Sequence, residues 1–259
     1  MNNVNKTLYI PLFAKSFVSE RGLFIDDKTA EKIWAEEGFP LRGKAKSKWL
    51  SYYLGMRARV FDDWVCEKAR EMPNAAIIHI GCGLDSRVLR VGKLCKAFYD
   101  VDLPEVIAER RRFFEECDGY RMIEGDACNP EWLGQIREST AIVIMEGVSM
   151  YIPRDKLAGL FSALSARFES VSLLMDCYSV FAAKMSKYKN PIKSVGVTKT
   201  YGIDEPEGLA VCGFSYLGEG EITPQKHIDE LVGTEKKIFS RLYAGKTAKK
   251  LYKLYEYKR

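Results

Sequence analysis

The sequence predicts an α/β fold in which a doubly wound sheet carries helices on both faces. From residue 75 onward, short apolar runs alternate with helical stretches, which is the pattern of parallel strands joined by crossover helices. The apolar runs are nearly continuous instead of alternating with polar residues, as expected for strands that are covered on both faces. With 259 residues, of which 47% are hydrophobic, the chain is long enough for one such domain with a large core.

The residues before Pro73 predict a helical extension, residues 1–72, that caps this core. One helix is expected over residues 25–37, where Asp26 and Asp27 supply capping acids at its start. A second helix is expected over residues 48–71, because apolar residues recur there at helical spacing.

Residues 73–259 are expected to form the main domain. Strands are predicted over residues 75–81, 96–102, 120–126, 140–147 and 171–179, and helical stretches over residues 85–95, 104–116 and 153–168. Residues 177–212 are polar and rich in lysine, so they predict a long, lid-like insertion. The sheet is completed by two late strands, within residues 213–222 and 249–258, with a helix from Thr223 between them.

The charge balance is that of an ordinary soluble enzyme and does not require a polyanionic partner. Forty basic residues against 35 acidic ones give a net charge of +5. Residues 236–259 are more basic, with nine Lys or Arg, one acid and the interleaved Tyr252, Tyr255 and Tyr257. Such a segment could bind nucleic acid, but a solvated helix face followed by a final strand is the favoured interpretation.

Seven cysteines without a CxxC pair argue against a disulfide framework and a zinc ribbon, so no metal site is expected. The N-terminal residues lack the basic and apolar regions of a secretory signal, and no run approaches eighteen apolar residues. We therefore expect a soluble cytoplasmic protein with reduced thiols and no membrane partner.

A glycine-rich loop follows the first predicted strand. Gly81 and Gly83 flank Cys82 where a strand runs into a helix, so backbone N–H groups and a close approach to the backbone are available to a ligand. The position of the third glycine in a dinucleotide fingerprint holds Ser86. The loop is therefore a poor cradle for pyrophosphate, which disfavours a nicotinamide dehydrogenase.

Acidic residues end the next three strands. Asp102, with Asp100 as second choice, is placed to accept hydrogen bonds from a ribose diol. Asp126, beside Ala127, suits an exocyclic amine, and Glu146 ends the fourth strand. A cofactor with a ribose, an adenine and a positive charge fits this array. The alternative is structural: the glycines make a tight turn and Asp102 caps the helix that Pro104 opens.

The motifs AKSFVSERGLFIDD, ARVFDD, IIHIGCGLDSRVLRV, YDVDLPEV, GDA and EGVSMYIPRDKL resemble, in this order, those of the leucine carboxyl methyltransferase family. The resemblance is close over residues 12–168 and looser in TYGIDEPEGL. It implies a Rossmann-like, mixed seven-stranded sheet with an insertion after the fifth strand. It also implies an O-methyltransferase that uses S-adenosylmethionine (SAM).

The resemblance assigns roles to individual residues. Lys15 and Arg59 match residues that hold the methionine carboxylate, Asp102 matches the ribose ligand, and Tyr151 matches a tyrosine that lines the methyl-transfer site. Gly81 and Gly83 match the cofactor loop, Asp126 and Ala127 the adenine contacts, and Glu146 a glutamate near the methionine. Salt bridges or solvent exposure are the alternatives for Lys15, Arg57 and Arg59, and simple packing is the alternative for Tyr151.

The acceptor is expected to be a carboxylate or hydroxyl of a small molecule or peptide C-terminus. Of the two histidines, His79 is expected to be buried in the core, and His227 has no evident partner. This shortage of bases favours an acidic acceptor, although a tyrosine or acid in residues 177–212 could serve as a base. Cys82 is expected to fit the turn without reacting.

Two other functions remain open. One is a protein that binds SAM without catalysis, and the other is an RNA methyltransferase that uses the basic C-terminal segment. The fourth strand ends in EGVSMY, unlike the [DNS]PP[FY] strand end of enzymes that methylate base amines, so no nucleic-acid partner is expected. The oligomeric state is left open.

Overall fold

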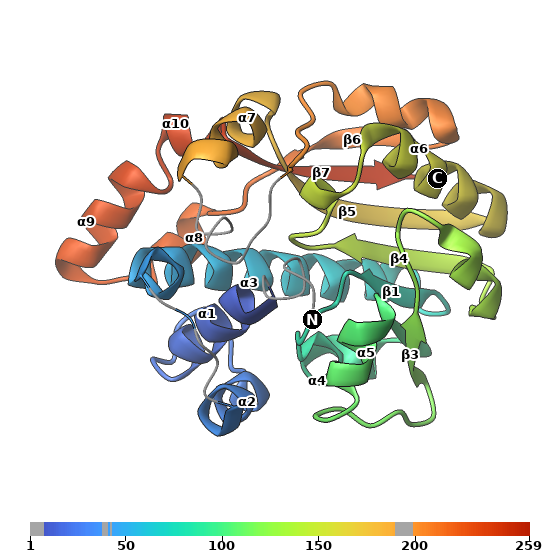
Figure 1. Cartoon of the computed structure of the whole chain (residues 1–259), viewed down its shortest axis with the longest axis horizontal. Helices are drawn as coiled ribbons and strands as arrows, with labels where there is room; N and C mark the ends of the chain where they lie inside the picture. The colour runs from blue at the N-terminus through green and yellow to red at the C-terminus, as the bar shows by residue number, and fades with distance from the viewer. Residues whose placement is uncertain (1–7, 38–40, 42, 190–198) are drawn as a thin grey trace.

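Seven strands form one sheet in the order β3-β2-β1-β4-β5-β7-β6 (Figure 1). The computed structural model describes residues 8–37, 41, 43–189 and 199–259. β1 to β5 run parallel, whereas β7 is antiparallel to both of its neighbours, β5 and β6. The strands span Ala76–Ile80 (β1), Ala97–Asp102 (β2), Tyr120–Glu124 (β3), Thr140–Met145 (β4), Ser170–Tyr178 (β5), Ser215–Gly220 (β6) and Tyr252–Lys258 (β7).

The parallel register brings the predicted strand ends to one edge of the sheet. His79 of β1 lies opposite Asp100 of β2 and Ile144 of β4. The chain leaves β1 toward β2 on one side, and β4 lies on the other, so the order reverses at β1. Ligands of open α/β sheets bind at such a switch point, outside the carboxyl ends of the strands.

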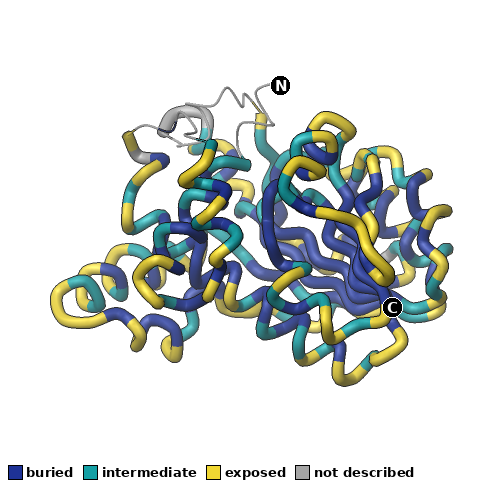
Figure 2. Tube along the Cα trace, turned by 90° about the horizontal axis from the view of Figure 1, so that it is seen from below, coloured by how far each residue is buried: buried dark blue, intermediate teal, exposed yellow. Residues whose placement is uncertain are grey.

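Two hydrophobic clusters cover the two faces of the sheet, so the strands are buried on both sides (Figure 2). On one face, Phe61 and Val65 of α3 (Lys48–Glu71) and Ile107 of α5 (Pro104–Arg110) pack with Ile77 and Ile142. The other face is covered by α6 (Arg154–Arg167), the 3-10 segment η4 (Pro130–Gln135) and η7 (Pro206–Cys212). This is the doubly wound arrangement that the nearly continuous apolar runs predict.

The N-terminal helices are continuous with this core. α1 (Tyr9–Ser19), α2 (Lys28–Glu37) and α3 pack together, and Leu12 and Ile33 join the cluster that covers the sheet. Asp27 accepts a hydrogen bond from the backbone N–H of Ala30 at 2.9 Å, so it caps α2 as expected. The helices predicted over residues 25–37 and 48–71 are both present. In contrast, the stretch predicted over residues 85–95 contains only the short α4 (Arg87–Val91), followed by η3 (Gly92–Leu94).

The segment after β5 contains α7 (Val180–Lys189) and η7, and the part of the predicted insertion at residues 190–198 lies outside the described residues. β5 extends to Tyr178, so the chain leaves the sheet after that residue. Whether residues 177–212 act as a lid stays a prediction.

The C-terminal segment forms α8 (Gln225–Ile228), α9 (Gly233–Leu242), α10 (Lys246–Lys249) and β7. Tyr255 and Tyr257 are buried in β7, where they cannot stack on a nucleic acid. Lys236 pairs with Asp229, and Lys253 pairs with Glu219. The favoured interpretation of this segment, a helix followed by a final strand, therefore agrees with the structure.

Within the described residues, no helix has the length and apolar character needed to cross a bilayer. The same residues contain no group of three or more His, Cys, Asp or Glu side chains arranged to hold a metal ion.

Candidate active site

A cavity of about 720 Å³ lies at the switch point, between the N-terminal helices and the carboxyl edge of the sheet. Its size is within the range of small-molecule sites, roughly 300–1,000 Å³. Along the sheet edge, the cavity has two parts. The charged half lies over β2, β1 and β4 and contains Lys15, Arg57, Asp85, Asp102 and Glu146. The tyrosine half lies over β5 and β7 and contains Tyr53, Tyr178, Leu251 and Tyr252.

The glycine loop forms part of the cavity wall. Gly81 has a φ of +72°, and a Cβ atom there would lie 2.7 Å from Val148, so a side chain is excluded by both conformation and space. Gly83 has a φ of +53°, and its N–H donates to Asp102 Oδ2 at 2.8 Å. Both predicted loop glycines therefore expose backbone to the cavity. Cys82 between them is buried, and burial raises the pKa of its thiol well above the ordinary value, which opposes thiolate chemistry.

Asp102 is the acid of β2 that lines the cavity. It accepts hydrogen bonds from the N–H groups of Gly83 and Leu103, both at 2.8 Å. Burial raises its pKa to about 6, against the opposing effect of these two donors. Asp100, the second choice, is fully buried below the cavity and pairs with Arg110 at 2.5 Å. The first choice is thus the one that a ligand can reach.

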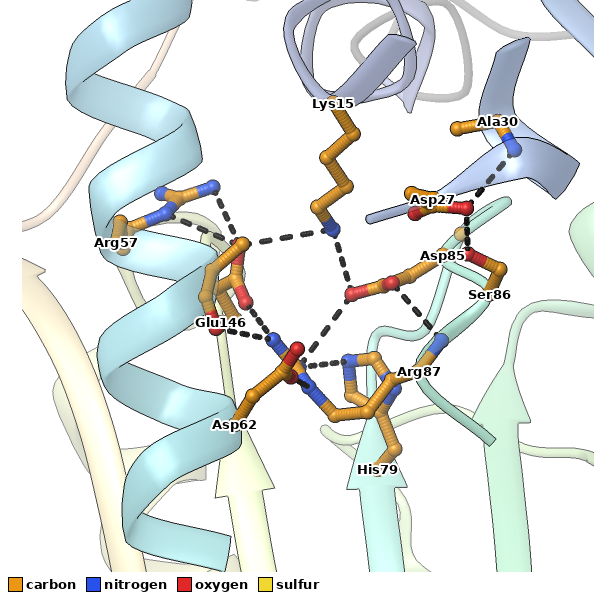
Figure 3. A network of polar contacts seen from close by, with 12 residues as sticks. Lys15, Asp27, Ala30, Arg57, Asp62, His79, Asp85, Ser86, Arg87 and Glu146 are labelled. Carbon is orange, nitrogen blue, oxygen red and sulfur yellow. Dashed lines mark hydrogen bonds and ion pairs between the residues drawn. The ribbon is translucent and has the colours of Figure 1, made fainter. Parts of the chain in front are cut away.

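Glu146 lies between three cations at the centre of the charged half (Figure 3). Its carboxylate contacts Arg57 at 3.1 Å, Lys15 at 3.8 Å and the guanidinium of Arg87. Burial would raise the pKa of Glu146, but Lys15, Arg87 and Arg57 lower it well below the ordinary value. Glu146 is therefore held in its ionised form and is a weak base.

The same network ties the glycine loop to the N-terminal helices. Asp85 pairs with Lys15 of α1 at 2.5 Å, and Arg87 pairs with Asp62 of α3 at 2.6 Å (Figure 3). Ser86 donates to Asp27, which also pairs with Arg90 at 2.6 Å. The serine that replaces the third fingerprint glycine thus joins the loop to the start of α2.

Six of the nine predicted site residues line the cavity: Lys15, Gly81, Gly83, Asp102, Glu146 and Tyr151. Arg59 does not, because its half-exposed side chain pairs with Asp63 at 2.7 Å and donates to the carbonyl of Phe24. Its neighbour Arg57 is buried and lines the cavity instead. Side chains two positions apart on an α-helix point in directions about 200° apart, so only one of the two arginines can face the cavity. The structure thus places Arg57, and not Arg59, in the cavity lining, and a role of either arginine in binding the cofactor remains a prediction.

Asp126 and Ala127 also lie outside the cavity lining. Asp126 is exposed, and its side chain accepts from the N–H of Cys128 at 2.8 Å within a tight turn. The turn follows β3, next to β2 and Asp102, so its position at the sheet edge is as expected. The adenine contacts assigned to these two residues remain a prediction.

Each of the two histidines lies beside charged side chains, and His79 also lines the cavity. His79 lies in β1, with Nδ1 3.3 Å from Asp100 and Nε2 3.4 Å from Arg87. Burial is the main cause that lowers the pKa of His79, and the Arg87 charge adds to it. His227 is away from the cavity, and its Nδ1 lies 3.0 Å from Glu230. Both are buried.

Two functional candidates escaped the sequence reasoning. Asp176 in β5 and Tyr252 at the start of β7 form a hydrogen-bonded group with Arg57 at the border of the two halves. The sequence contains a signal for Asp176, because this residue is an acid within the apolar run VSLLMDCYS. The sequence contains no such signal for Tyr252, because its hydrogen-bond partner Asp176 lies 76 positions earlier in the chain.

Comparisons with known proteins identify methyltransferases that are similar to this chain. The chain is 26% identical over 212 residues to the tetracenomycin polyketide synthesis O-methyltransferase TcmP of Streptomyces glaucescens, covering 81% of this chain and 78% of that protein. It is 27% identical over 237 residues, with the same coverage, to the S-adenosyl-L-methionine-dependent methyltransferase dpfgK of Gibberella zeae.

Among solved structures, the chain resembles the magnesium protoporphyrin IX methyltransferase of Synechocystis PCC 6803 with bound S-adenosylhomocysteine (SAH). The TM-score is 0.53 at 13% identity, covering 98% of this chain and 99% of that one. This likeness confirms the expected class I methyltransferase fold, Rossmann-like with a mixed seven-stranded sheet. The model of the leucine carboxyl methyltransferase family matches residues 3–165. The chain therefore belongs to the leucine carboxyl methyltransferase family.

Proposed function

We propose that this chain transfers the methyl group of SAM to an oxygen atom of a small molecule. Family membership and the SAM-dependent relatives make the chain a SAM-dependent methyltransferase, as the sequence motifs implied. Its similarity to a polyketide O-methyltransferase favours an oxygen atom as the acceptor. The observation that carries the proposal is the charged half of the cavity, whose charges suit SAM.

The charge of the lining fits the cofactor. SAM carries a sulfonium, an ammonium and a carboxylate, hence a net charge of +1 near neutral pH. Among the described lining residues, Asp85, Asp102 and Glu146 outnumber Lys15 and Arg57 by one charge. This surplus of acids would repel a pyrophosphate, whereas it attracts a sulfonium.

The residues of the charged half have distinct proposed roles. Gly81 and Gly83 let the cofactor approach the backbone, and Asp102 accepts hydrogen bonds from the ribose hydroxyls. Lys15 and Arg57 hold the methionine carboxylate. Glu146 keeps these two cations in place and offers its negative charge to the ammonium.

When bound, SAM supplies a methyl group on a positively charged sulfur, and an acceptor oxygen displaces the thioether while the broken C–S bond leaves its electron pair on sulfur. The chain's task is then to align the acceptor with the methyl group and to exclude water. Tyr151, on the 3-10 turn η5 (Ser149–Tyr151) after β4, lines the cavity and is proposed to pack beside the transfer site.

A binding and a turnover measurement test the proposal. Calorimetry with SAH should show one site per chain, and methyl-labelled SAM should yield a methylated product from a panel of carboxylates and phenols. SAH binding without any product across the panel would favour the alternative, a cofactor-binding protein without catalysis. Absence of SAH binding would reject the proposed cofactor site.

A further inference from the structure

The tyrosine half of the cavity indicates a class of methyl acceptor, and this inference rests on the proposed function. We infer that this half binds an uncharged aromatic alcohol, a phenol, whose hydroxyl group is held by Tyr252 and whose proton passes through Tyr252 to Asp176. The evidence is the distribution of cations, the arrangement of the aromatic rings and the hydrogen bonds of the Arg57, Asp176 and Tyr252 side chains.

The cations of the described cavity lining are already paired with carboxylates. Lys15 contacts Asp85 at 2.5 Å and Glu146 at 3.8 Å, and Arg57 contacts Glu146 at 3.1 Å and Asp176 at 2.9 Å. The methionine carboxylate of the cofactor would share these same two cations. A second carboxylate, on the acceptor, would find no unpaired cation among the described lining residues, so its desolvation would be poorly compensated. An uncharged acceptor avoids this cost.

Aromatic rings surround the border between the two halves. The ring of Tyr252 lies 5.1 Å from that of Tyr178 and 6.1 Å from that of Tyr53, between centroids, at interplanar angles of 56° and 50°. All three side chains line the cavity, together with Leu251. Tilted rings at these distances are a favourable environment for another aromatic ring.

The hydroxyl of Tyr252 is oriented by two neighbours. It donates to Asp176 Oδ2 at 2.7 Å and accepts from Arg57 Nη1 at 2.9 Å. A tyrosine hydroxyl can donate one hydrogen bond and accept two. Within the contacts of the described residues, Tyr252 therefore retains one acceptor position, and a phenol hydroxyl can donate to it.

Asp176 is suited to receive the proton. It is fully buried behind Tyr252, and its other oxygen accepts from the N–H of Gly147 at 2.7 Å. Burial raises the pKa of Asp176 above its ordinary value, although Arg57 and Tyr252 oppose this effect. A carboxylate with a raised pKa is a stronger base.

The proposed transfer is balanced in atoms and charge. As the acceptor oxygen forms its bond to the methyl carbon, its proton moves to the Tyr252 oxygen, and the Tyr252 proton moves to the Asp176 carboxylate. The products are the aryl methyl ether, the thioether and a neutral Asp176, which returns its proton to solvent before the next turnover.

Two probes with the same ring test the acceptor class on the wild-type chain. The full chain is saturated with SAH and then titrated with 2-naphthol or 2-naphthoate in a calorimeter. We expect 2-naphthol to bind at least tenfold more tightly. Equal or tighter binding of 2-naphthoate, or no binding of 2-naphthol, overturns the inference while leaving the cofactor site intact. Failure of SAH itself to bind would instead reject the proposed function.

Variants test the two named residues. Tyr252→Phe should weaken 2-naphthol binding about fivefold, the effect of one hydrogen bond, and leave 2-naphthoate binding unchanged. Tyr257→Phe is the matched control, because it removes a hydroxyl from the same strand that contacts the carbonyl of Pro206 instead. Undiminished 2-naphthol binding by Tyr252→Phe overturns its role.

Asp176→Asn separates binding from proton transfer. With SAM and 2-naphthol, kcat for 2-methoxynaphthalene formation should fall roughly a hundredfold, the lower range of general base catalysis, while KM changes less than about threefold. Retention of the wild-type kcat, or no turnover of 2-naphthol by the wild type, overturns the proton transfer to Asp176. Circular dichroism of each variant establishes that it is folded.

Discussion

The two halves of the cavity are built on different principles. In the charged half, opposite charges from α1, α3, the glycine loop, α4 and the residue after β4 pair within a single buried network. In the tyrosine half, the contacts are ring packing and one hydrogen-bonded group, contributed mainly by α3, β5 and β7. This difference agrees with the proposed function, in which the charged half binds the cofactor and the tyrosine half binds the acceptor.

The largest effect should come from breaking the charged network. Arg87→Met removes a fully buried guanidinium that pairs with Asp62 at 2.6 Å and with Glu146. Two buried carboxylates then lose a partner, so the free energy of unfolding should fall by about 3–5 kcal/mol, measured by urea denaturation. Arg112→Met, which breaks solvent-screened pairs with Glu37 and Glu109, is the control and should lower the free energy of unfolding far less. Equal losses in the two variants would contradict the distinction.

A smaller but more specific effect is expected from replacing the two cations that line the cavity, Lys15 and Arg57. Lys15→Met and Arg57→Met should each weaken SAH binding by about tenfold to a hundredfold, because each removes one of the charged hydrogen bonds proposed to hold the methionine carboxylate. Arg59→Met should leave SAH affinity within about twofold, since this side chain points away from the cavity. A loss of SAH binding in Arg59→Met alone would restore the original motif assignment.

Asp102 should make cofactor binding depend on pH. Its pKa is raised to about 6, so below pH 6 the carboxyl is protonated and loses an acceptor for the ribose hydroxyls. The Kd for SAH should be about tenfold higher at pH 5 than at pH 7, measured by calorimetry. Asp102→Asn should bind weakly at both values and show no such step. A pH-independent Kd in the wild type would remove Asp102 from the ribose site.

The same shift affects the stability of the free protein. The pKa of Asp102 is higher in the folded chain than its ordinary value of 3.8, so the folded state binds this proton more tightly than the unfolded state. The contribution of Asp102 to the free energy of unfolding should therefore decrease as the pH rises from about 4 to 6. Comparison of the wild type with Asp102→Asn in urea isolates this contribution.

The smallest effect is expected at Cys82. Cys82→Ala removes a buried thiol whose raised pKa keeps it protonated, so turnover and SAH affinity should stay within about twofold. The free energy of unfolding should fall by roughly 1 kcal/mol for the small cavity that remains. A loss of turnover by several orders of magnitude would show that the thiol reacts.

Much of the fold could be predicted because its signals are local. Apolar runs mark β1 to β5, and the capping residue Asp27 marks the start of α2. Gly81 and Asp102 could be selected as candidates for the same reason, since Gly81 directly follows β1 and Asp102 is the last residue of β2.

The remaining site residues depend on distances that no local pattern encodes. Arg57 and Arg59 are two positions apart, so a motif match that is shifted by two residues selects the opposite side of α3. Tyr252 joins the site only because β7 pairs antiparallel with β5, which brings it opposite Tyr178. The sequence alone does not reveal a general base, because the candidate pair, Asp176 and Tyr252, comes from two different strands of the sheet.

The link between the glycine loop and α2, made through Ser86 and Asp27, has a consequence for engineering. Chimaeras that exchange residues 1–72 between relatives would be a natural way to change acceptor preference. Three ion pairs cross the junction of such a chimaera: Lys15 with Asp85, Asp27 with Arg90, and Asp62 with Arg87. If the recipient lacks the matching residue of a pair, a charge is buried without a counter-ion. The transferable unit is therefore the set of matched pairs, and a donor segment should be chosen by its complementarity to the recipient loop.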